Sequence, residues 1–382
     1  MRIGVVRETA PGERRVAIVP AAVSRLTTLG AEVLIERDAG AGAYFPDAEY
    51  AQVGARIVSR EELYAESDAV LSVGASPDDL PGLVRRGQAV VVLWQPGTRP
   101  ELVDGLAEAG ATLITLAGVP RTLSRAQTMD ALSSQANVAG YQAVLMAAAA
   151  YPRYFPMLIT AAGTARPAEV LVLGAGVAGL QAIGTARRLG AVVRGYDVRP
   201  DTREQVESVG GEFVELEAVE GGAGSGGYAR ALTGQEQRSQ QEQLAGQIAR
   251  HDVVVTTAQV PGKPPPVLVT AEAVKAMRPG SVIVDLAAGP FGGNVALSRP
   301  EETVTTDNAV TIIGAGNLPS AMAPASSTAY SRNLCALLEY LVDDGELGVE
   351  GDDEIRAGVV ALREGRSTRD PEPTGNQGGA TR

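Results

Sequence analysis

The sequence is poor in the residues that hold metals, form cross-links and shuttle protons. Its 382 residues include one cysteine, Cys335, and one histidine, His251. A single cysteine excludes a disulfide framework, and with one histidine a Cys/His zinc site is nearly excluded as well. We therefore expect a chain from a reducing, intracellular compartment.

Positive charge and long apolar runs are scarce too. The 33 Lys and Arg residues are outnumbered by 45 Asp and Glu residues, which leaves a net charge of -12. Such a surface repels phosphate backbones and anionic head groups, so we expect neither nucleic-acid binding nor basic docking on a membrane. The best candidate for a membrane span, residues 141–163, is interrupted by Pro152, Arg153 and Pro156 and falls short of the roughly 20 apolar residues that a bilayer needs. No secretory signal pattern is visible, so we expect a soluble chain without membrane insertion.

Aromatic residues make up only 4%, whereas 45 glycines lie between short apolar runs, as is typical of an α/β protein with many tight turns. Strands are expected at residues 2–6, 31–36, 69–73, 89–94, 112–116, 169–173, 191–197, 252–256, 281–286 and 310–313. Helices are expected at 20–29, 61–66, 100–110, in the later part of 124–150, at 177–189 and at 326–342.

This alternation predicts the α/β fold class, with two Rossmann-like, doubly wound parallel-sheet domains joined by long helices. We expect one domain from residues 1–135 together with 326–365, and a second from 136–325. Residues 366–382 are rich in Ser, Pro and Gly and are expected to form a disordered tail.

A glycine motif follows the buried strand pattern at 169–173. Gly174, Gly176 and Gly179 form G-x-G-x-x-G, and a helix pattern starts at Val177. The first glycine permits a tight turn, the second lets the backbone approach a pyrophosphate, and the third lets helix and strand pack closely. Asp197 ends the next strand about 20 residues on, where an acid binds the adenosine ribose hydroxyls. The motif therefore predicts a dinucleotide site.

Asp197 favours NAD(H) over NADP(H), because a carboxylate repels a 2′-phosphate. Arg199 and Arg203 follow closely, and an arginine there could hold a 2′-phosphate or stack on the adenine. NAD(H) is the preferred cofactor at this point, and NADP(H) stays open.

The sequence offers few groups for proton transfer, which oxidation of an alcohol or an amino acid requires together with hydride transfer. His251 precedes a strand at the end away from the ligand edge, and we interpret it as a surface residue. Only Lys263 and Lys275 occur, and Lys263 lies in a loop where a solvated position is the simpler interpretation. The pattern indicates hydride exchange between two nicotinamides, which needs no proton shuttle.

An unusual stretch precedes the strand at 252–256. Residues 220–227 read EGGAGSGG, and the segment 235–247 is rich in glutamine. We expect a flexible loop and an exposed helix, which form either a functional lid or a tolerated insertion, with the spacing slightly in favour of the insertion.

Five further segments are distinctive: GERRVAIVP at 12–20, SRAQTMDALSS at 124–134, GYAR at 227–230, TTAQVPGKP at 256–264 and VDLAA at 284–288. With these segments the chain resembles the soluble NAD(H)-binding alpha subunit (domain I) of proton-translocating nicotinamide nucleotide transhydrogenase, and more distantly alanine dehydrogenase. The resemblance implies a homodimer that works with membrane-spanning and NADP(H)-binding partner subunits, on the cytoplasmic face of the inner membrane.

The resemblance also implies the site residues. Arg121, Gln127 and Asp130 would form the polar cluster at the nicotinamide, and Ser133 would contact its carboxamide. One extra residue before Gln127 leaves the arginine role open between Arg121 and Arg125, and Ser124 or Asp130 could instead cap the long helix. The further nucleotide-binding positions would be the mobile-loop residues Gly227 and Tyr228, then Gln240, Ala258 and Gln259.

Two alternatives remain. An alanine dehydrogenase carries Arg, Lys and His in its substrate pocket; here Arg15 is present, but the strand ends at 71–74 and 93–95 lack the Lys and the His. We interpret Arg15 as a partner in an ion pair within the first domain. The other alternative is a non-catalytic module that senses NAD(H).

Overall fold

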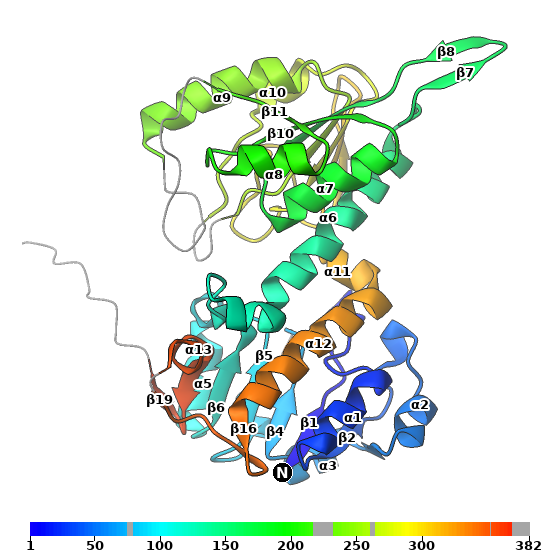
Figure 1. Ribbon diagram of the computed structural model, residues 1–382. Helices are drawn as coiled ribbons and strands as arrows, with labels where there is room; N and C mark the ends of the chain where they lie inside the picture. Colours follow the sequence, from blue (N-terminus) through cyan, green and yellow to red (C-terminus); the bar gives the residue numbers. More distant parts are fainter. Residues whose placement is uncertain (75–78, 217–231, 260–263, 352, 369–382) are drawn as a thin grey trace, which may run out of the picture. The chain divides into compact units, whose positions relative to one another are not determined.

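The computed structural model describes residues 1–74, 79–216, 232–259, 264–351 and 353–368 (Figure 1). The chain forms two compact units, unit 1 (Met1–Leu132 with Ser327–Arg382) and unit 2 (Ser133–Ser326). It passes between the units within the helices α6 (Ala131–Ala150) and α12 (Ala323–Leu341). The expected α/β class, with two mainly parallel sheets joined by long helices, is confirmed.

Unit 1 contains an eight-stranded sheet in the order β19-β18-β6-β5-β4-β1-β2-β3. Its strands are β1 (Arg2–Val5), β2 (Glu32–Glu36), β3 (Arg56–Val58), β4 (Ala69–Leu71), β5 (Ala89–Val92), β6 (Thr112–Thr115), β18 (Val360–Arg363) and β19 (Arg366–Ser367). The six strands from β3 to β6 are parallel, and the winding direction changes between β1 and β4. Strand β18 pairs with β6 in antiparallel direction, and β19 pairs with β18 in the same way. Residues 366–367 therefore belong to a strand, where we expected the start of a disordered tail.

The connections of unit 1 follow local sequence signals. Helix α1 (Pro20–Thr28) has proline at its first position, and Gly30 follows it with φ +77. Ser59 and Glu62 form a capping box at the start of α3 (Arg60–Glu66). The remaining elements are η1 (Ala41–Ala43), α2 (Asp47–Gln52), α4 (Leu80–Leu83), η2 (Pro96–Thr98), α5 (Pro100–Glu108), η3 (Leu116–Gly118), η4 (Ser124–Met129), β16 (Val342–Asp343), β17 (Glu346–Leu347) and α13 (Glu354–Val359).

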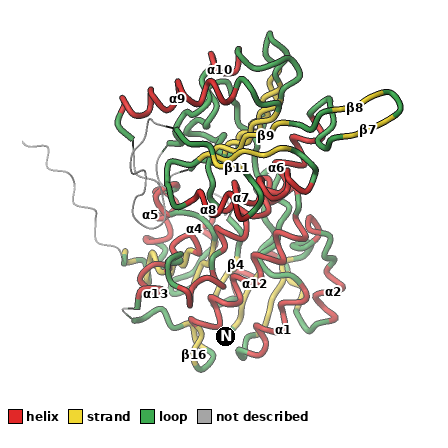
Figure 2. Tube along the Cα trace, turned by 45° about the horizontal axis from the view of Figure 1, so that its top comes forward, coloured by secondary structure: helices red, strands yellow, loops and turns green. Residues whose placement is uncertain are grey.

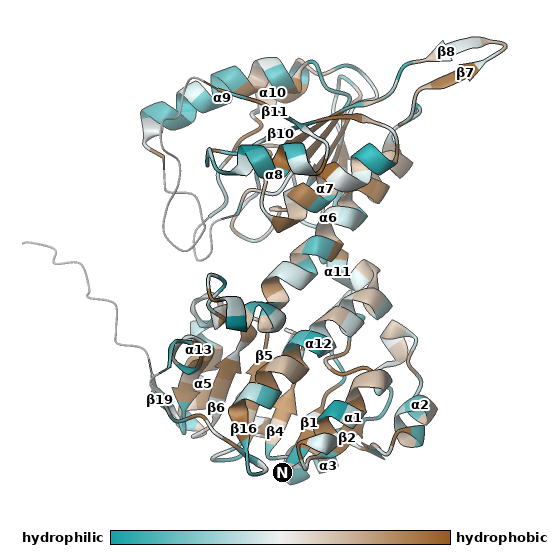
Figure 3. Ribbon diagram, in the orientation of Figure 1, coloured by the Kyte–Doolittle hydropathy of each residue, from teal (hydrophilic) through white to brown (hydrophobic). Residues whose placement is uncertain are grey.

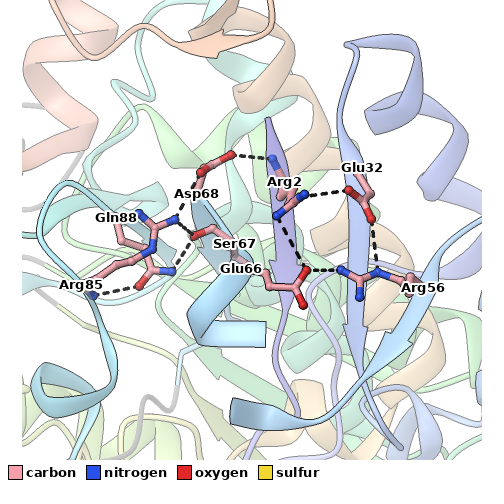
Figure 4. A network of polar contacts seen from close by, with 8 residues as sticks. All are labelled: Arg2, Glu32, Arg56, Glu66, Ser67, Asp68, Arg85 and Gln88. Carbon is pink, nitrogen blue, oxygen red and sulfur yellow. Dashed lines mark hydrogen bonds and ion pairs between the residues drawn. The ribbon is translucent and has the colours of Figure 1, made fainter. Parts of the chain in front are cut away.

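A polar network links the amino-terminal ends of the strands in unit 1 (Figure 4). Arg2 on β1 pairs with Glu32 on β2 at 3.1 Å, and Arg56 on β3 pairs with both Glu32 and Glu66. These side chains are largely exposed, so each pair stabilises the fold only slightly. The network therefore lies at the end of the sheet opposite the carboxyl ends of these strands.

Unit 2 contains a seven-stranded sheet in the order β11-β10-β9-β12-β13-β15-β14, parallel except for β14. Its strands are β9 (Glu169–Leu173), β10 (Val192–Tyr196), β11 (Glu212–Phe213), β12 (Val253–Thr256), β13 (Val282–Asp285), β14 (Thr303–Thr305) and β15 (Thr311–Gly314). Its other helices are α7 (Val177–Arg188), α8 (Thr202–Ser208), α9 (Gly234–Ile248), α10 (Ala271–Lys275) and α11 (Leu318–Ala321). The winding direction changes between β9 and β12, and ligands bind at the carboxyl ends of strands at such a point.

Apolar clusters cover both faces of this sheet, and Figure 3 shows the apolar colour of its central strands. On β9, Val170 and Val172 join the apolar cluster on one face, and Leu171 and Leu173 join the cluster on the other. All four side chains have no exposed surface. A continuous apolar run without alternation is what a parallel strand covered on both faces requires.

A two-stranded hairpin, β7 (Leu158–Thr160) and β8 (Gly163–Ala165), extends away from the rest of unit 2 in both Figure 1 and Figure 2. Two apolar side chains here are exposed: Ile159 on β7 is 77% exposed, and Met157, just before β7, is 60% exposed. Among the described residues, no helix is long and apolar enough to cross a bilayer.

Two expectations in unit 2 were wrong. His251 is not a surface residue: it is only 1% exposed, and its ring bonds to the carbonyl of Gln247 and to Arg194. The glutamine-rich helix α9 is not wholly exposed either: Gln240, Leu244 and Ile248 are buried, because they recur at helical spacing and face the sheet.

Candidate functional site

The glycine motif lies at the carboxyl end of β9, at the change in winding direction. Gly174 has φ +102, a conformation that side chains rarely adopt. A Cβ atom on Gly179 would overlap the carbonyl oxygen of Gly174, so only glycine lets α7 approach the strand this closely. Backbone conformation therefore explains the first glycine, and packing explains the third.

Gly176 is explained by neither. Its φ is -75, an ordinary value, and a Cβ atom there would meet no atom of the described chain within 4 Å. Gly176 is the N-cap of α7, and no side chain caps this helix end. Uncapped N–H groups and the positive end of the helix dipole together attract an anion, and bare backbone lets it come close.

Asp197 stands directly after β10, beside the glycine turn. Its carboxylate accepts the N–H of Ala175 at 2.8 Å and the backbone N–H of Arg199 at 3.0 Å. The guanidinium of Arg199 also donates to both carboxylate oxygens at 2.9 Å. These bonds occupy the roughly four lone-pair sites of a carboxylate, so a ligand hydroxyl can bind Asp197 only when Arg199 moves aside.

The segment that follows β12 lies beside the glycine turn. Thr257 donates its hydroxyl to the carbonyl of Gly174 at 3.0 Å. Ala258 donates its N–H to the side chain of Asn294 at 3.0 Å, and the exposed Gln259 donates its amide to the carbonyl of Leu286 at 3.0 Å. The sequence indicates this segment only by resemblance, and it gives no sign of Asn294.

Of the remaining predicted nucleotide contacts in unit 2, Gln240 is buried, and the other two lie outside the described residues. Gln240 is only 2% exposed, and its amide donates to the hydroxyl of Tyr196 at 2.9 Å, so it lies beneath the surface. Burial raises the pKa of Tyr196, which keeps this hydroxyl neutral. Gly227 and Tyr228 lie outside the described residues.

Most of the predicted nicotinamide cluster lies in unit 1. Arg121 pairs with Asp130 at 3.2 Å, with 31% and 11% of their side chains exposed. Arg125 lies 3.8 Å from Glu354. Gln127 is exposed, and its backbone carbonyl accepts the N–H of Asp130 at 3.2 Å. The structure thus brings Arg121 and Asp130 together, and Arg125 makes a different ion pair. Ser133 belongs to unit 2, in the first turn of α6.

Among the described residues, His251 is the candidate proton carrier whose position is best defined, and it lies at the end of its strand away from the glycine turn. His251 lies at the amino-terminal end of β12, where its Nδ1 donates to the carbonyl of Gln247 at 2.6 Å and its Nε2 accepts from Arg194 at 3.4 Å. Burial lowers the pKa of His251, and Arg194 lowers it further. Lys263 lies outside the described residues, and Lys275 is an exposed residue at the end of α10.

Arg15 forms the expected ion pair within unit 1. Its guanidinium lies 2.6 Å from Glu13, with 10% and 3% of the two side chains exposed. The pair is therefore largely desolvated, and Arg15 already has a carboxylate partner.

Models of two adjacent domains match almost the whole chain. The alanine dehydrogenase/PNT N-terminal domain matches residues 4–139, and the alanine dehydrogenase/PNT C-terminal domain matches residues 143–370. The chain belongs to the alanine dehydrogenase/PNT family. Membership implies that it binds a nucleotide, in agreement with the geometry of the glycine turn.

Within the family, the chain is more similar to transhydrogenase subunits than to alanine dehydrogenases. It is 42% identical to NAD(P) transhydrogenase subunit alpha of Haemophilus influenzae, over 96% of this chain and 71% of that one. The alanine dehydrogenase of Mycobacterium tuberculosis is 30% identical over 90% and 88% of the two chains. The crystal structure of transhydrogenase from Sinorhizobium meliloti superposes with a TM-score of 0.83 at 37% identity, over 96% and 98%. These similarities identify the chain as a homologue of the transhydrogenase alpha subunit.

Proposed function

We propose that this chain binds NAD(H) at the glycine turn of unit 2 and transfers hydride directly between NADH and NADP⁺ that a separate subunit holds. The observation that carries the binding proposal is Gly176, a glycine that neither its backbone conformation nor packing among the described residues requires. A pyrophosphate at the end of α7 explains it, because a side chain would stand where the ligand approaches.

The residues present fit the adenosine half of NAD(H). Asp197 lies next to the turn, and its carboxylate can accept the ribose hydroxyls once Arg199 releases it. A 2′-phosphate in this position would meet the same negative charge. The released Arg199 is then available to stack on the adenine.

The composition of the site fits hydride transfer without proton transfer. The bound cofactor supplies the hydride from C4 of its nicotinamide ring, and a second nicotinamide accepts it, so no proton moves at the reacting carbon. The chain's task is to position the ring and exclude water. The resemblance assigns Arg121, Gln127, Asp130 and Ser133 to the carboxamide and ribose, which they would orient by hydrogen bonds, and none of them would need to act as an acid or a base.

We further propose a homodimer that acts with membrane-spanning and NADP(H)-binding subunits at the cytoplasmic face of the membrane. Homology to a transhydrogenase alpha subunit supports partner subunits. The hairpin β7–β8 supports the dimer, because two isolated strands are marginally stable and Met157 and Ile159 expose apolar surface to solvent.

Two glycine variants test the binding proposal. Gly176→Ala should weaken NADH binding by about tenfold or more, because a methyl group stands in the path of the pyrophosphate. Gly246→Ala is the matched control: Gly246 lies in α9 of the same unit, and a Cβ there also meets nothing within 4 Å among the described residues. Fluorescence titration with NADH should show unchanged affinity for the control. Equal affinity of both variants would contradict the proposal.

Similarity to alanine dehydrogenases favours one alternative, NAD⁺-dependent oxidation of alanine. The Arg15–Glu13 pair argues against it, because the arginine that would bind the substrate carboxylate already has a partner. Steady production of NADH from NAD⁺ and alanine by the isolated protein would support the alternative over our proposal. A non-catalytic NAD(H) sensor would bind NADH and exchange no hydride with any partner.

A further inference from the structure

We infer that Asn294, a residue outside the glycine motif, is a positioning residue. Its side chain holds the segment after β12 in place beside the glycine turn of unit 2. This inference rests on the proposed function, because its role is to fix the segment that faces the glycine turn. Asn294 follows β13 and has no exposed surface. Its importance comes from three linked sets of hydrogen bonds.

The first set fixes the backbone of Asn294. Asp285, the last residue of β13, is fully buried. Its carboxylate accepts the hydroxyl of Thr256 at 2.8 Å and the N–H groups of Ala287, Asn294 and Val295 at 3.0 to 3.3 Å. A carboxylate is costly to bury without a cation, so these donors are what keep it there. They fold the loop after β13 back onto the strand.

Glycine is required at one point of this loop. A Cβ atom on Gly293 would overlap the carboxylate of Asp285. The loop therefore passes so close to Asp285 that the position of the next residue, Asn294, is fixed.

The second set joins the side chain of Asn294 to the segment after β12. Its amide oxygen accepts the N–H of Ala258 at 3.0 Å, and its amide nitrogen donates to the carbonyls of Ala258 at 2.9 Å and Pro266 at 2.8 Å. Both backbone groups of Ala258 are thus bound by one side chain, as a neighbouring strand would bind them. The segment is fixed although the sheet has ended.

The third set carries this constraint to the glycine turn. Thr257 precedes Ala258 and bonds to the turn twice: its N–H donates to the carbonyl of Leu173 at 2.8 Å and its hydroxyl to that of Gly174 at 3.0 Å. A Cβ atom on Gly174 would lie 2.6 Å from the hydroxyl of Thr257. Movement of Ala258 would therefore move Thr257 and disturb the turn.

Binding of NADH to the full chain tests the inference. Asn294→Ala should weaken binding by about tenfold, since it removes three hydrogen bonds that hold Ala258 and its neighbourhood. Asn308→Ala is the matched control. The amide nitrogen of Asn308, in the same unit, donates to the carbonyls of Val274, Lys275 and Met277, and its amide oxygen accepts the hydroxyl of Thr306, so the side chain is as heavily bonded as that of Asn294 but does not join the glycine turn. The Asn308→Ala variant should bind NADH within about twofold of wild type, even if it lowers the free energy of unfolding as much as Asn294→Ala does.

A double-mutant cycle separates positioning from loss of structure. Thr257→Val should weaken NADH binding about as much as Asn294→Ala, and Thr257→Ser, which retains the hydroxyl, should restore it. If Asn294 acts through Thr257, the double variant is no weaker than either single variant. Should Asn294→Ala fail to fold, Asn294→Asp retains the acceptor for Ala258 and serves in its place, with the same expected non-additivity.

The outcomes distinguish the inference from the proposed function. Wild-type protein that does not bind NADH would overturn the proposed function. Wild-type binding together with unchanged affinity of the Asn294 variant, additive effects in the cycle, or an equal loss in the Asn308 control would overturn the inference alone.

Discussion

Replacement of Asp197 by asparagine should change the nucleotide preference of the chain. Asparagine keeps an oxygen that can accept the N–H of Ala175, so the glycine turn stays anchored. It removes the negative charge that would bind the ribose hydroxyls of NADH and repel the 2′-phosphate of NADPH. It also removes the partner of Arg199, whose guanidinium now lies 2.9 Å from the carboxylate.

The size of the effect follows from these contacts. A hydrogen bond to a charged group contributes about 1.5 to 3 kcal/mol, roughly twice a neutral one, so loss of the charge should weaken NADH binding about tenfold. Two like charges 4 Å apart repel by about 4 kcal/mol at an effective dielectric constant of 20, and Arg199 already offsets some of this repulsion. We therefore expect NADPH to bind about tenfold more tightly, which changes the affinity ratio about a hundredfold, or about 2.7 kcal/mol.

Fluorescence titrations with NADH and NADPH measure both affinities. Asp201→Asn is the control, because Asp201 is exposed in the same loop and its side chain makes no capping bond to α8. A further Arg199→Gln change in the Asp197→Asn background should abolish the gain for NADPH. The reasoning is refuted if the ratio changes by less than about twofold, or if the wild-type chain prefers NADPH.

Three further predictions concern packing, pH and the nicotinamide cluster. Gly140→Ala should lower the free energy of unfolding by about 1 to 3 kcal/mol in denaturant titrations, because its Cβ would overlap the carbonyl oxygen of Ala178 in the first turn of α7. Stability should fall as the pH drops below 6.5, because the pKa of His251 is lowered from 6.5 in the folded chain and the unfolded chain therefore binds more protons; a His251→Gln variant should lack this contribution to the pH dependence. Arg121→Gln should slow hydride transfer in the reconstituted enzyme, whereas Arg125→Gln should not.

Each of these has a clear contrary result. For the packing prediction, Gly184→Ala on α7 is the control, since its Cβ would meet only the far end of Arg188 at 3.8 Å; an equal loss at both sites would contradict it. If the stability of the His251→Gln variant still fell in the same way below pH 6.5, the protons would bind to another group and the prediction for His251 would be wrong. A slower rate for Arg125→Gln alone would reverse the assignment of the arginine.

The sequence predicts those elements of the fold that short-range patterns determine. The run at 170–173 is apolar at every position, and this indicates a strand with both faces covered. The three-residue strand β3 and the antiparallel strand β19 were missed, because their few residues carry no period and the pairing partners are distant. His251 was misplaced for a related reason: its position before a strand does not reveal that its ring is buried and bonds to Arg194, 57 residues away in the sequence.

The same distinction applies to the site. The glycine motif is contiguous, so its turn could be predicted residue by residue, and Asp197 follows it at a known spacing. Asn294 could not be found in this way, because it is joined to Ala258 across 36 residues and no local pattern marks it. The choice between Arg121 and Arg125 stays a prediction: the sequence places both shortly before Asp130, and the structure adds that Arg121 pairs with Asp130 and Arg125 with Glu354.

Transfer of an isotope label between nucleotides tests the central claim, hydride transfer without proton transfer, most directly. The chain is combined with its NADP(H)-binding partner subunit, NADH deuterated at the transferred position of C4, and NADP⁺ in ordinary water. We predict that the deuterium appears at C4 of NADPH without dilution by solvent. Hydrogen from solvent at that position, or no transfer by a chain that instead reduces NAD⁺ with alanine, would contradict the claim.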